Sequence, residues 1–216
     1  MKMAKQEAQN SEKQVLFLCQ SPHLANLVRE MVGDTVTVLD TYSLFTLIID
    51  DLSSLQPPFY TGLSYKLKPD VTLYDAIFVD EAQDFTYEWA VLIRKLLSDP
   101  KESRLGIFYD DVQVLREDSF GDGFGITEKP FLLRENIRNT ANIYNWTAEK
   151  TRLGTDVIAN PVEGPTPQTE VINDQRQMIH YLEVFFRRYL EDEHLSNGSL
   201  AVVVDDVDSF VGLFPD

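Results

Sequence analysis

Residues 74–85 read YDAIFVDEAQDF, and this stretch decides the fold predicted for the chain. Residues 74–79 form the strongest strand pattern of the chain and are apolar except for Asp75. An acidic cluster follows directly, and apolar residues then recur at helical spacing at Trp89, Leu92, Ile93, Leu96 and Leu97. The pattern predicts a core strand that delivers carboxylates at its carboxyl end, followed by a helix that packs on the sheet.

A second acidic strand end lies further along the chain. Residues 105–109 are typical of a strand, and Asp110 and Asp111 come directly after them. The carboxyl ends of neighbouring parallel strands share one edge of a sheet, which is where open α/β sheets bind ligands. We therefore expect the two acidic groups to lie close together at a ligand-binding edge.

Upstream of residue 74, strand and helix patterns alternate. The expected elements are the end of a helix at 3–11, a strand at 14–19, a helix at 24–31, a strand at 35–39 and a helix at 43–52. A Pro-bearing loop over 55–70 then leads back to the core strand. This alternation favours an open α/β sheet with helices on its faces.

The second half of the chain has weaker patterns. The expected elements are a flexible Gly/Asp loop at 121–125, a short strand at 131–133, a helix at 140–150, an amphipathic helix at 174–191 and an apolar strand at 199–204. A Pro-rich stretch, PVEGPTPQT, separates the first three elements from the last two and is typical of a linker.

Composition limits the class of protein. Nineteen Lys and Arg residues stand against 35 Asp and Glu residues, which gives a net charge of −16 and argues against tight, autonomous DNA binding, since that normally requires a basic face. The single cysteine, Cys19, excludes a disulfide framework and is expected to be a buried core thiol. Neither a membrane-spanning apolar run nor a signal sequence is recognisable, so we expect a cytoplasmic location.

The paired acids Asp80 and Glu81 fit the chemistry of nucleoside triphosphate hydrolysis. Such a site needs one carboxylate to hold Mg²⁺ and a neighbouring group to orient or deprotonate the attacking water. The alternative is a solvated acidic turn after a core strand. Gln83 and Asp84 extend the pair into the longer string DEAQD, which favours the hydrolytic interpretation.

This string resembles the second motif of the superfamily 1 DNA helicases of the UvrD/Rep type. The resemblance implies that Asp80 coordinates Mg²⁺, that Glu81 activates the hydrolytic water, and that Gln83 couples the state of the nucleotide to DNA contacts. Downstream, FYDDVQVL at 108–115 is similar to the third motif, which implies that Gln113 senses the γ-phosphate.

LRENIRN at 133–139 is similar to the fourth motif, which implies that Arg138 reaches the γ-phosphate. The planar fork of an arginine suits it to neutralise phosphoryl oxygens as the bond breaks. Taken alone, Arg138 would be interpreted as a surface helix cation. The order of the three motifs favours the catalytic role.

Two looser matches bear on DNA. VLFLCQSPHLANLVRE at 15–30 and VTVLDTYSL at 36–44 are similar to family segments that touch single-stranded DNA, which makes Ser21, His23 and Ser43 candidate DNA contacts. Asp40, Thr41 and Tyr42 stand where the family usually has Thr, Phe and His. The candidate residues serve equally well as helix caps and turn residues.

The phosphate cradle of the family is missing. No G-x-x-x-x-G-K-[ST] string occurs in the 216 residues, and residue 1 aligns with the middle of the helix that follows that string in the family. The segment at 52–70 is also too short for the extra domain that helicases of this type insert there. We therefore expect a truncated product of a longer protein, with a complete protein that never bound nucleotide as the alternative.

The resemblance implies an incomplete RecA-like fold of the P-loop NTPase type, a three-layer open parallel sheet that lacks its amino-terminal part. Residues 1–158 would form most of a first RecA-like domain, 159–170 a linker, and 171–216 the start of a second. The parent would use ATP and Mg²⁺ to move on single-stranded DNA, whereas this chain would bind nucleotide and DNA weakly or not at all. A non-catalytic acidic module that binds a protein partner is the rival hypothesis.

Overall fold

The computed structural model describes residues 1–9, 12–49, 67–110, 120–151 and 157–212. The chain divides into two units, Met1–Leu132 and Leu133–Asp216. The sequence predicts a different division, into 1–158, 159–170 and 171–216. That division stays a prediction.

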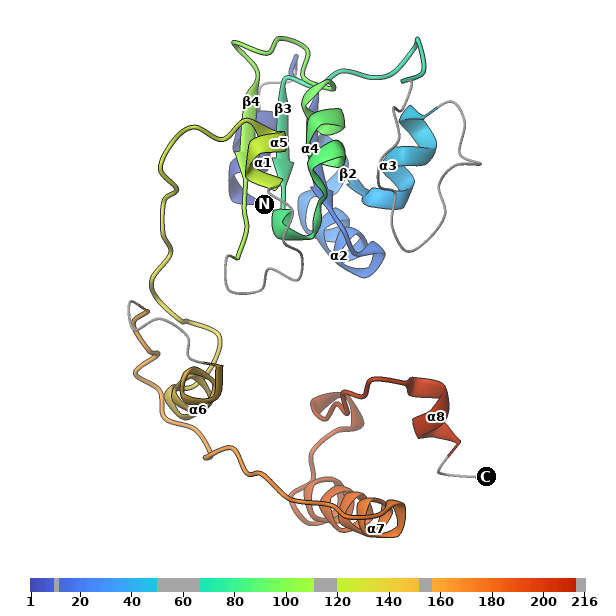
Figure 1. Cartoon of the computed structure of the whole chain (residues 1–216), viewed down its shortest axis with the longest axis vertical. Coiled ribbons are helices and arrows are strands. Elements are labelled where there is room, and N and C mark those ends of the chain that lie inside the picture. Colours follow the sequence, from blue (N-terminus) through green and yellow to red (C-terminus); the bar gives the residue numbers. More distant parts are fainter. Residues whose placement is uncertain (10–11, 50–66, 111–119, 152–156, 213–216) are drawn as a thin grey trace. The chain divides into compact units, whose positions relative to one another are not determined.

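The described strands of the first unit form one open, all-parallel sheet of four strands in the order β2-β1-β3-β4 (Figure 1). The strands are β1 (Val15–Cys19), β2 (Thr37–Asp40), β3 (Ala76–Val79) and β4 (Arg104–Ile107). β1 and β3 lie in the centre of the sheet, and every residue in them is buried. Their uninterrupted apolar sequences are what a strand covered on both faces requires, so the predicted α/β fold with an open parallel sheet is confirmed.

Helices cover both faces of this sheet. They are α1 (Lys2–Ala8), α2 (Pro22–Val32), α3 (Thr41–Ile48), α4 (Tyr87–Arg94) and α5 (Phe120–Phe124). Alternate residues of β1 and β3 belong to two separate cores, because successive side chains of a strand point to opposite faces. One core includes residues of α1 and α2 and the other residues of α3, α4 and α5, so the unit has three layers.

The predicted flexible loop at 121–125 is wrong, because residues Phe120–Phe124 form the short helix α5 against α4. Gly123 allows the close approach: a Cβ atom there would lie 2.6 Å from the Tyr87 carbonyl oxygen and 2.7 Å from the Ala90 Cβ. Gly125 ends the segment with φ +67°, a conformation that glycine adopts without strain. The glycines therefore serve packing here and do not make a loop.

The second unit contains α6 (Ala141–Thr151), α7 (Gln175–Phe186), a turn of π-helix (Arg187–Asp192), a short 3₁₀ turn (Asn197–Ser199) and α8 (Val207–Val211). The predicted helices at 140–150 and 174–191 are confirmed, the second with Asp174 as its N-cap. None of the described residues of this unit is buried. Its apolar side chains, such as Val203 with 94% exposure, are therefore not part of a core within the described ranges.

The two short strands predicted in the second half are not formed. Residues 131–133 and 199–204 belong to no strand, and no ladder partner faces them among the described residues. An apolar, β-branched sequence becomes a strand only when a neighbour accepts its backbone hydrogen bonds. Within the described ranges, every helix is also too short or too polar to span a lipid bilayer.

Candidate active site

The four parallel strands end at one edge of the sheet, and each end carries a polar or titratable side chain. β1 ends at Cys19 and β2 at Asp40, while Asp80 directly follows β3 and Asp110 follows β4 by three residues. A hydrogen bond of 3.1 Å from the Asp110 amide to the side chain of Gln83 brings the ends of β3 and β4 together. The ends of β3 and β4 are thus neighbours at this edge, while the predicted closeness of the acidic side chains stays a prediction and Asp111 lies outside the described residues.

Asp80 is fixed by its backbone, whose amide donates to the Leu18 carbonyl at 2.9 Å. Its side chain is half-buried. Burial raises the pKa of Asp80 above its ordinary value and the charge of Glu81 raises it further, while the Glu81 amide, 3.2 Å from Oδ1, and the amino terminus lower it in part. The ionised carboxylate is thus disfavoured where it stands, and a cation beside it would relieve that cost.

Glu81 has a left-handed backbone, with φ 52° and ψ 46°. For a residue other than glycine this conformation costs on the order of 1–2 kcal/mol. A 3₁₀ turn, Ala82–Asp84, follows, and the Ala82 amide donates to the Phe108 carbonyl at 2.9 Å. The turn leaves the Glu81 side chain exposed, so its carboxylate can reach a water or a ligand at the edge of the sheet. Strain of this kind gathers at functional sites.

Gln83 is buried, with 4% of its surface exposed, and both ends of its amide are hydrogen-bonded. Nε2 donates to Glu81 Oε2 at 2.6 Å, and Oε1 accepts from the Asp110 amide at 3.1 Å. The side chain therefore links the exposed acid to the backbone beyond β4.

The side chains present fit Mg²⁺ only as a partial ligand set. No group of three or more His, Cys, Asp or Glu side chains converges on one point within the described ranges. Mg²⁺ is commonly held by one or two carboxylates, with waters and substrate phosphates completing its six positions. Asp80, with Glu81 beside it, can supply the carboxylate share of such a site.

The candidate DNA contacts Ser21 and Ser43 both serve helix starts. Ser21 accepts from the Leu24 amide at 3.4 Å and caps α2. Asp40 caps α3 by accepting from the Ser43 amide at 2.9 Å, and the Ser43 hydroxyl donates to Asp40 at 2.5 Å. The capping alternative is thus present for Ser21, whereas Ser43 is the residue whose amide Asp40 caps. His23 is exposed in the first turn of α2.

Two buried groups near the site, Asp40 and Cys19, have shifted pKa values. Burial of Asp40 alone would raise its pKa, but the hydrogen bonds from Ser43 outweigh it and the pKa is lowered. Burial, with the charges of Asp80 and Asp40, raises the pKa of Cys19 to about 11. The predicted buried core thiol is confirmed, since Cys19 is 0% exposed and belongs to the core under α1 and α2.

The two remaining candidates lie outside the described residues of the first unit. Gln113 lies outside the described residues. Arg138 belongs to the second unit, where it is exposed in the segment before α6. Their roles stay predictions.

Two features of the site were not predicted. The left-handed backbone of Glu81 has no signal in the sequence, because no glycine or asparagine marks it. The bridge made by Gln83 joins residues 27 positions apart, which local patterns do not reveal. Gln83 directly follows Ala82 and lies two residues before Phe85, and these buried apolar neighbours were the available hint that its side chain turns inward.

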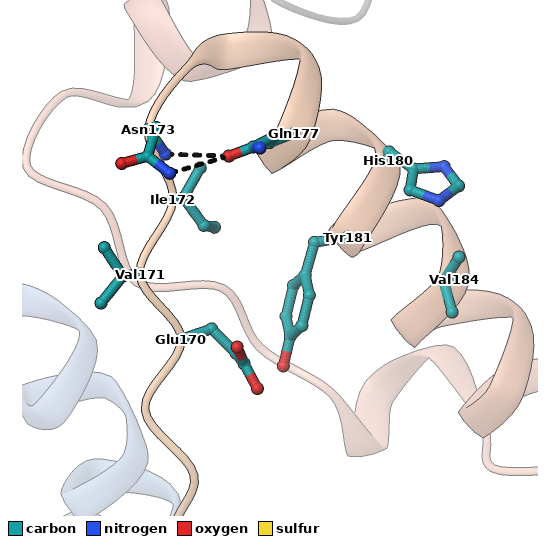
Figure 2. Close-up of a pocket in the computed structure, with 8 residues that line it drawn as sticks. All are labelled: Glu170, Val171, Ile172, Asn173, Gln177, His180, Tyr181 and Val184. Atoms are coloured by element: carbon teal, nitrogen blue, oxygen red, sulfur yellow. Dashed lines mark hydrogen bonds between the residues drawn. The ribbon is translucent and has the colours of Figure 1, made fainter.

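The second unit has a pocket of its own, of about 360 Å³, between the extended segment 170–173 and α7 (Figure 2). Asn173 closes one end by hydrogen bonds from its backbone and side-chain nitrogens to Gln177 Oε1, at 3.0 and 3.5 Å. The lining residues, among them His180 and Tyr181, are exposed, and none is a buried polar group. The pocket therefore lacks the fixed polar groups that a reaction site needs.

A scan of the chain against protein-family models finds no match, and a search of curated proteins finds none either.

Proposed function

We propose that this chain carries the acidic half of an ATP-hydrolysing site of the superfamily 1 DNA helicase type. One observation supports the proposal most strongly: an adjacent Asp80 and Glu81 follow a fully buried central strand, with Glu81 held in a strained backbone conformation. A solvated acidic turn would have no reason to keep that strain.

In this proposal Asp80 holds Mg²⁺ and Glu81 takes the proton of the attacking water. Mg²⁺, when bound, would neutralise charge on the phosphate oxygens. Asp80 would be held ionised by the cation, which offsets the burial that raises its pKa. Glu81 is exposed and can accept a proton at Oε1, while Oε2 accepts the hydrogen bond from Gln83.

The other parts of the proposed site are less complete. Gln113 and Arg138 are proposed to contact the γ-phosphate. A cradle for the phosphates is not encoded in the 216 residues and would be supplied by another segment. We therefore propose that the chain by itself hydrolyses ATP at a negligible rate.

The proposed parent moves on single-stranded DNA in the cytoplasm. With a net charge of −16, this chain is expected to bind DNA weakly or not at all by itself. Ser21, His23 and Ser43 remain the proposed contacts, and their effect is expected only where other segments add positive charge.

ATP turnover in two forms of the protein tests the proposal. The chain alone should stay at background, with or without single-stranded DNA. A form with a strand and a G-x-x-x-x-G-K-[ST] loop joined ahead of residue 1 should turn ATP over, and Glu81→Gln should lower that rate by about 100-fold or more. Asp34→Asn, at an exposed acid in the turn before β2, is the matched control and should leave the rate unchanged. Absence of turnover in the extended form, or turnover that survives Glu81→Gln, would contradict the proposal.

The second candidate is a non-catalytic acidic module that binds a protein partner. The charge of −16 and the exposed apolar side chains of the second unit favour it. The gene separates the two: coding sequence for a glycine-rich phosphate loop directly upstream of the Met1 codon favours the motor domain, whereas a translation start signal there favours the module. Loss of ATP turnover on Glu81→Gln, in the form with the added phosphate loop, would also exclude the module.

A further inference from the structure

The orientation of the Gln83 amide is fixed by its two partners. A backbone N–H can only donate, so the amide oxygen of Gln83 must face the Asp110 nitrogen at 3.1 Å. An ionised carboxylate can only accept, so the amide nitrogen must face Glu81 Oε2 at 2.6 Å. Exchanging the two ends would break both hydrogen bonds, and the side chain therefore has one satisfied orientation.

The bridge is also held rigidly in place. Gln83 lies in the middle of the 3₁₀ turn Ala82–Asp84 and is almost fully buried. The first residue of the turn, Ala82, is hydrogen-bonded to the Phe108 carbonyl at 2.9 Å. The turn is thus joined to the chain beyond β4 at two points, one from its backbone and one from its side chain.

We propose that Gln83 is a positioning residue that sets the direction of the Glu81 carboxylate and ties it to the backbone at Asp110. Its meaning for catalysis rests on the proposed function of Glu81. A displacement of the chain beyond β4 would move Asp110, then the Gln83 amide, and finally the proton-accepting carboxylate. The position of the Asp110 backbone thereby affects the direction of the Glu81 carboxylate.

This role differs from direct contact with a nucleotide. Each end of the Gln83 amide already has a protein partner, and the side chain is 4% exposed. Loss of the amide would leave the Glu81 carboxylate free to turn on its own bonds. The expected defect is in the chemical step rather than in the affinity for ATP.

The first test uses the whole 216-residue chain and amide hydrogen exchange followed by NMR. Gln83→Met keeps the shape but removes both hydrogen bonds, and it should speed exchange at the Asp110 amide about tenfold relative to the Ile77 amide in β3. Gln83→Glu keeps an acceptor for Asp110 but cannot donate to Glu81, so Asp110 exchange should stay within about threefold of the natural chain.

Transmission along the bridge is tested by removing the far partner. Glu81→Ala should shift the Asp110 amide resonance, whereas Glu30→Ala, at an exposed acid on α2, should not. The proposal would be overturned if Glu81→Ala left the Asp110 amide resonance unchanged. It would also be overturned if Gln83→Met sped exchange equally at the Asp110 and Ile77 amides. The second outcome would mean that Gln83 stabilises the unit as a whole and does not hold the Asp110 backbone in particular.

The second test uses the form with a phosphate loop joined ahead of residue 1. Gln83→Met should lower kcat about tenfold or more and leave the KM for ATP within about twofold. A raised KM with unchanged kcat would mean that Gln83 contacts the nucleotide, and would overturn the positioning role. If no form turns ATP over, the proposed function fails, while the NMR result still decides whether the bridge exists.

Discussion

Helices α4 and α7 are both amphipathic, yet they have different surroundings. α4, in the first unit, buries Trp89, Ala90, Leu92 and Ile93 against the sheet. α7, in the second unit, buries none of its residues within the described structure. Apolar spacing therefore predicts that a helix forms, and the sheet decides whether its apolar face becomes part of a core. We expect the first unit to unfold cooperatively and the second to contribute little to global stability.

Matched isoleucines give the largest expected contrast. Ile77 is 0% exposed in β3, and Ile137 is 81% exposed in the second unit. Ile77→Ala should lower the free energy of unfolding by about 2–5 kcal/mol, whereas Ile137→Ala should change it by less than about 0.5 kcal/mol. Urea denaturation followed by Trp89 fluorescence in a Trp146→Phe background measures both. Equal losses would mean that the second unit shares a core with the first.

Two aspartates that cap helices give the next contrast. Asp40 accepts from the Ser43 amide and Asp174 from the Gln177 amide, each at 2.9 Å. Asp40→Ala should cost about 1–2 kcal/mol of global stability, whereas Asp174→Ala should lower only the local helix content of α7. Denaturation and circular dichroism distinguish the two effects.

The lowered pKa of Asp40 predicts that the stability of the first unit depends on pH. The pKa of Asp40 is lower in the folded chain than its ordinary value, so its contribution to stability is present above about pH 4 and is lost as the pH falls through the folded pKa. Asp40→Asn should flatten that part of the stability curve. If Asp40→Asn lost as much stability at acid pH as the natural chain, the role given to Asp40 would be contradicted.

Asp80 should affect the pH dependence of stability in the opposite direction to Asp40. Its pKa is raised, chiefly by burial, so its ionisation disfavours the folded state at neutral pH and the cost disappears as the pH falls through the folded pKa. Asp80→Asn should therefore stabilise the first unit at pH 7 by roughly 1 kcal/mol, and the gain should shrink toward pH 4. Asp192→Asn, at an exposed acid of the second unit, should change nothing measurable. Thermal denaturation across this pH range tests both variants.

The smallest contrast compares two residues other than glycine with positive φ. Glu81 has φ 52° in the first unit and His194 has φ 56° in the second. Glu81→Gly should raise the free energy of unfolding by about 0.5–1 kcal/mol, because glycine adopts this backbone without strain. His194→Gly should leave the main transition unchanged. A destabilising Glu81→Gly would mean that the side chain stabilises the turn more than its backbone strains it.

Much of the first unit could be predicted because its signals are local. The buried strands that became β1 and β3, and the acids after β3, follow from short apolar runs and their flanks. The failures depended on partners distant in sequence. Residues 131–133 and 199–204 have strand-like composition but no facing strand among the described residues, and Gly123 entered a helix because α4 lies against it. The bridge through Gln83 likewise joins residues 27 positions apart, which lie beyond the ends of two different strands.

The buried thiol of Cys19 provides a probe for the opening of the first unit. Cys19 is the single cysteine of the chain and lies fully covered in the central strand β1, where its pKa of about 11 keeps it protonated. A thiol reagent can reach it only when the sheet opens. The rate at which Cys19 is modified therefore reports the rate at which the first unit opens.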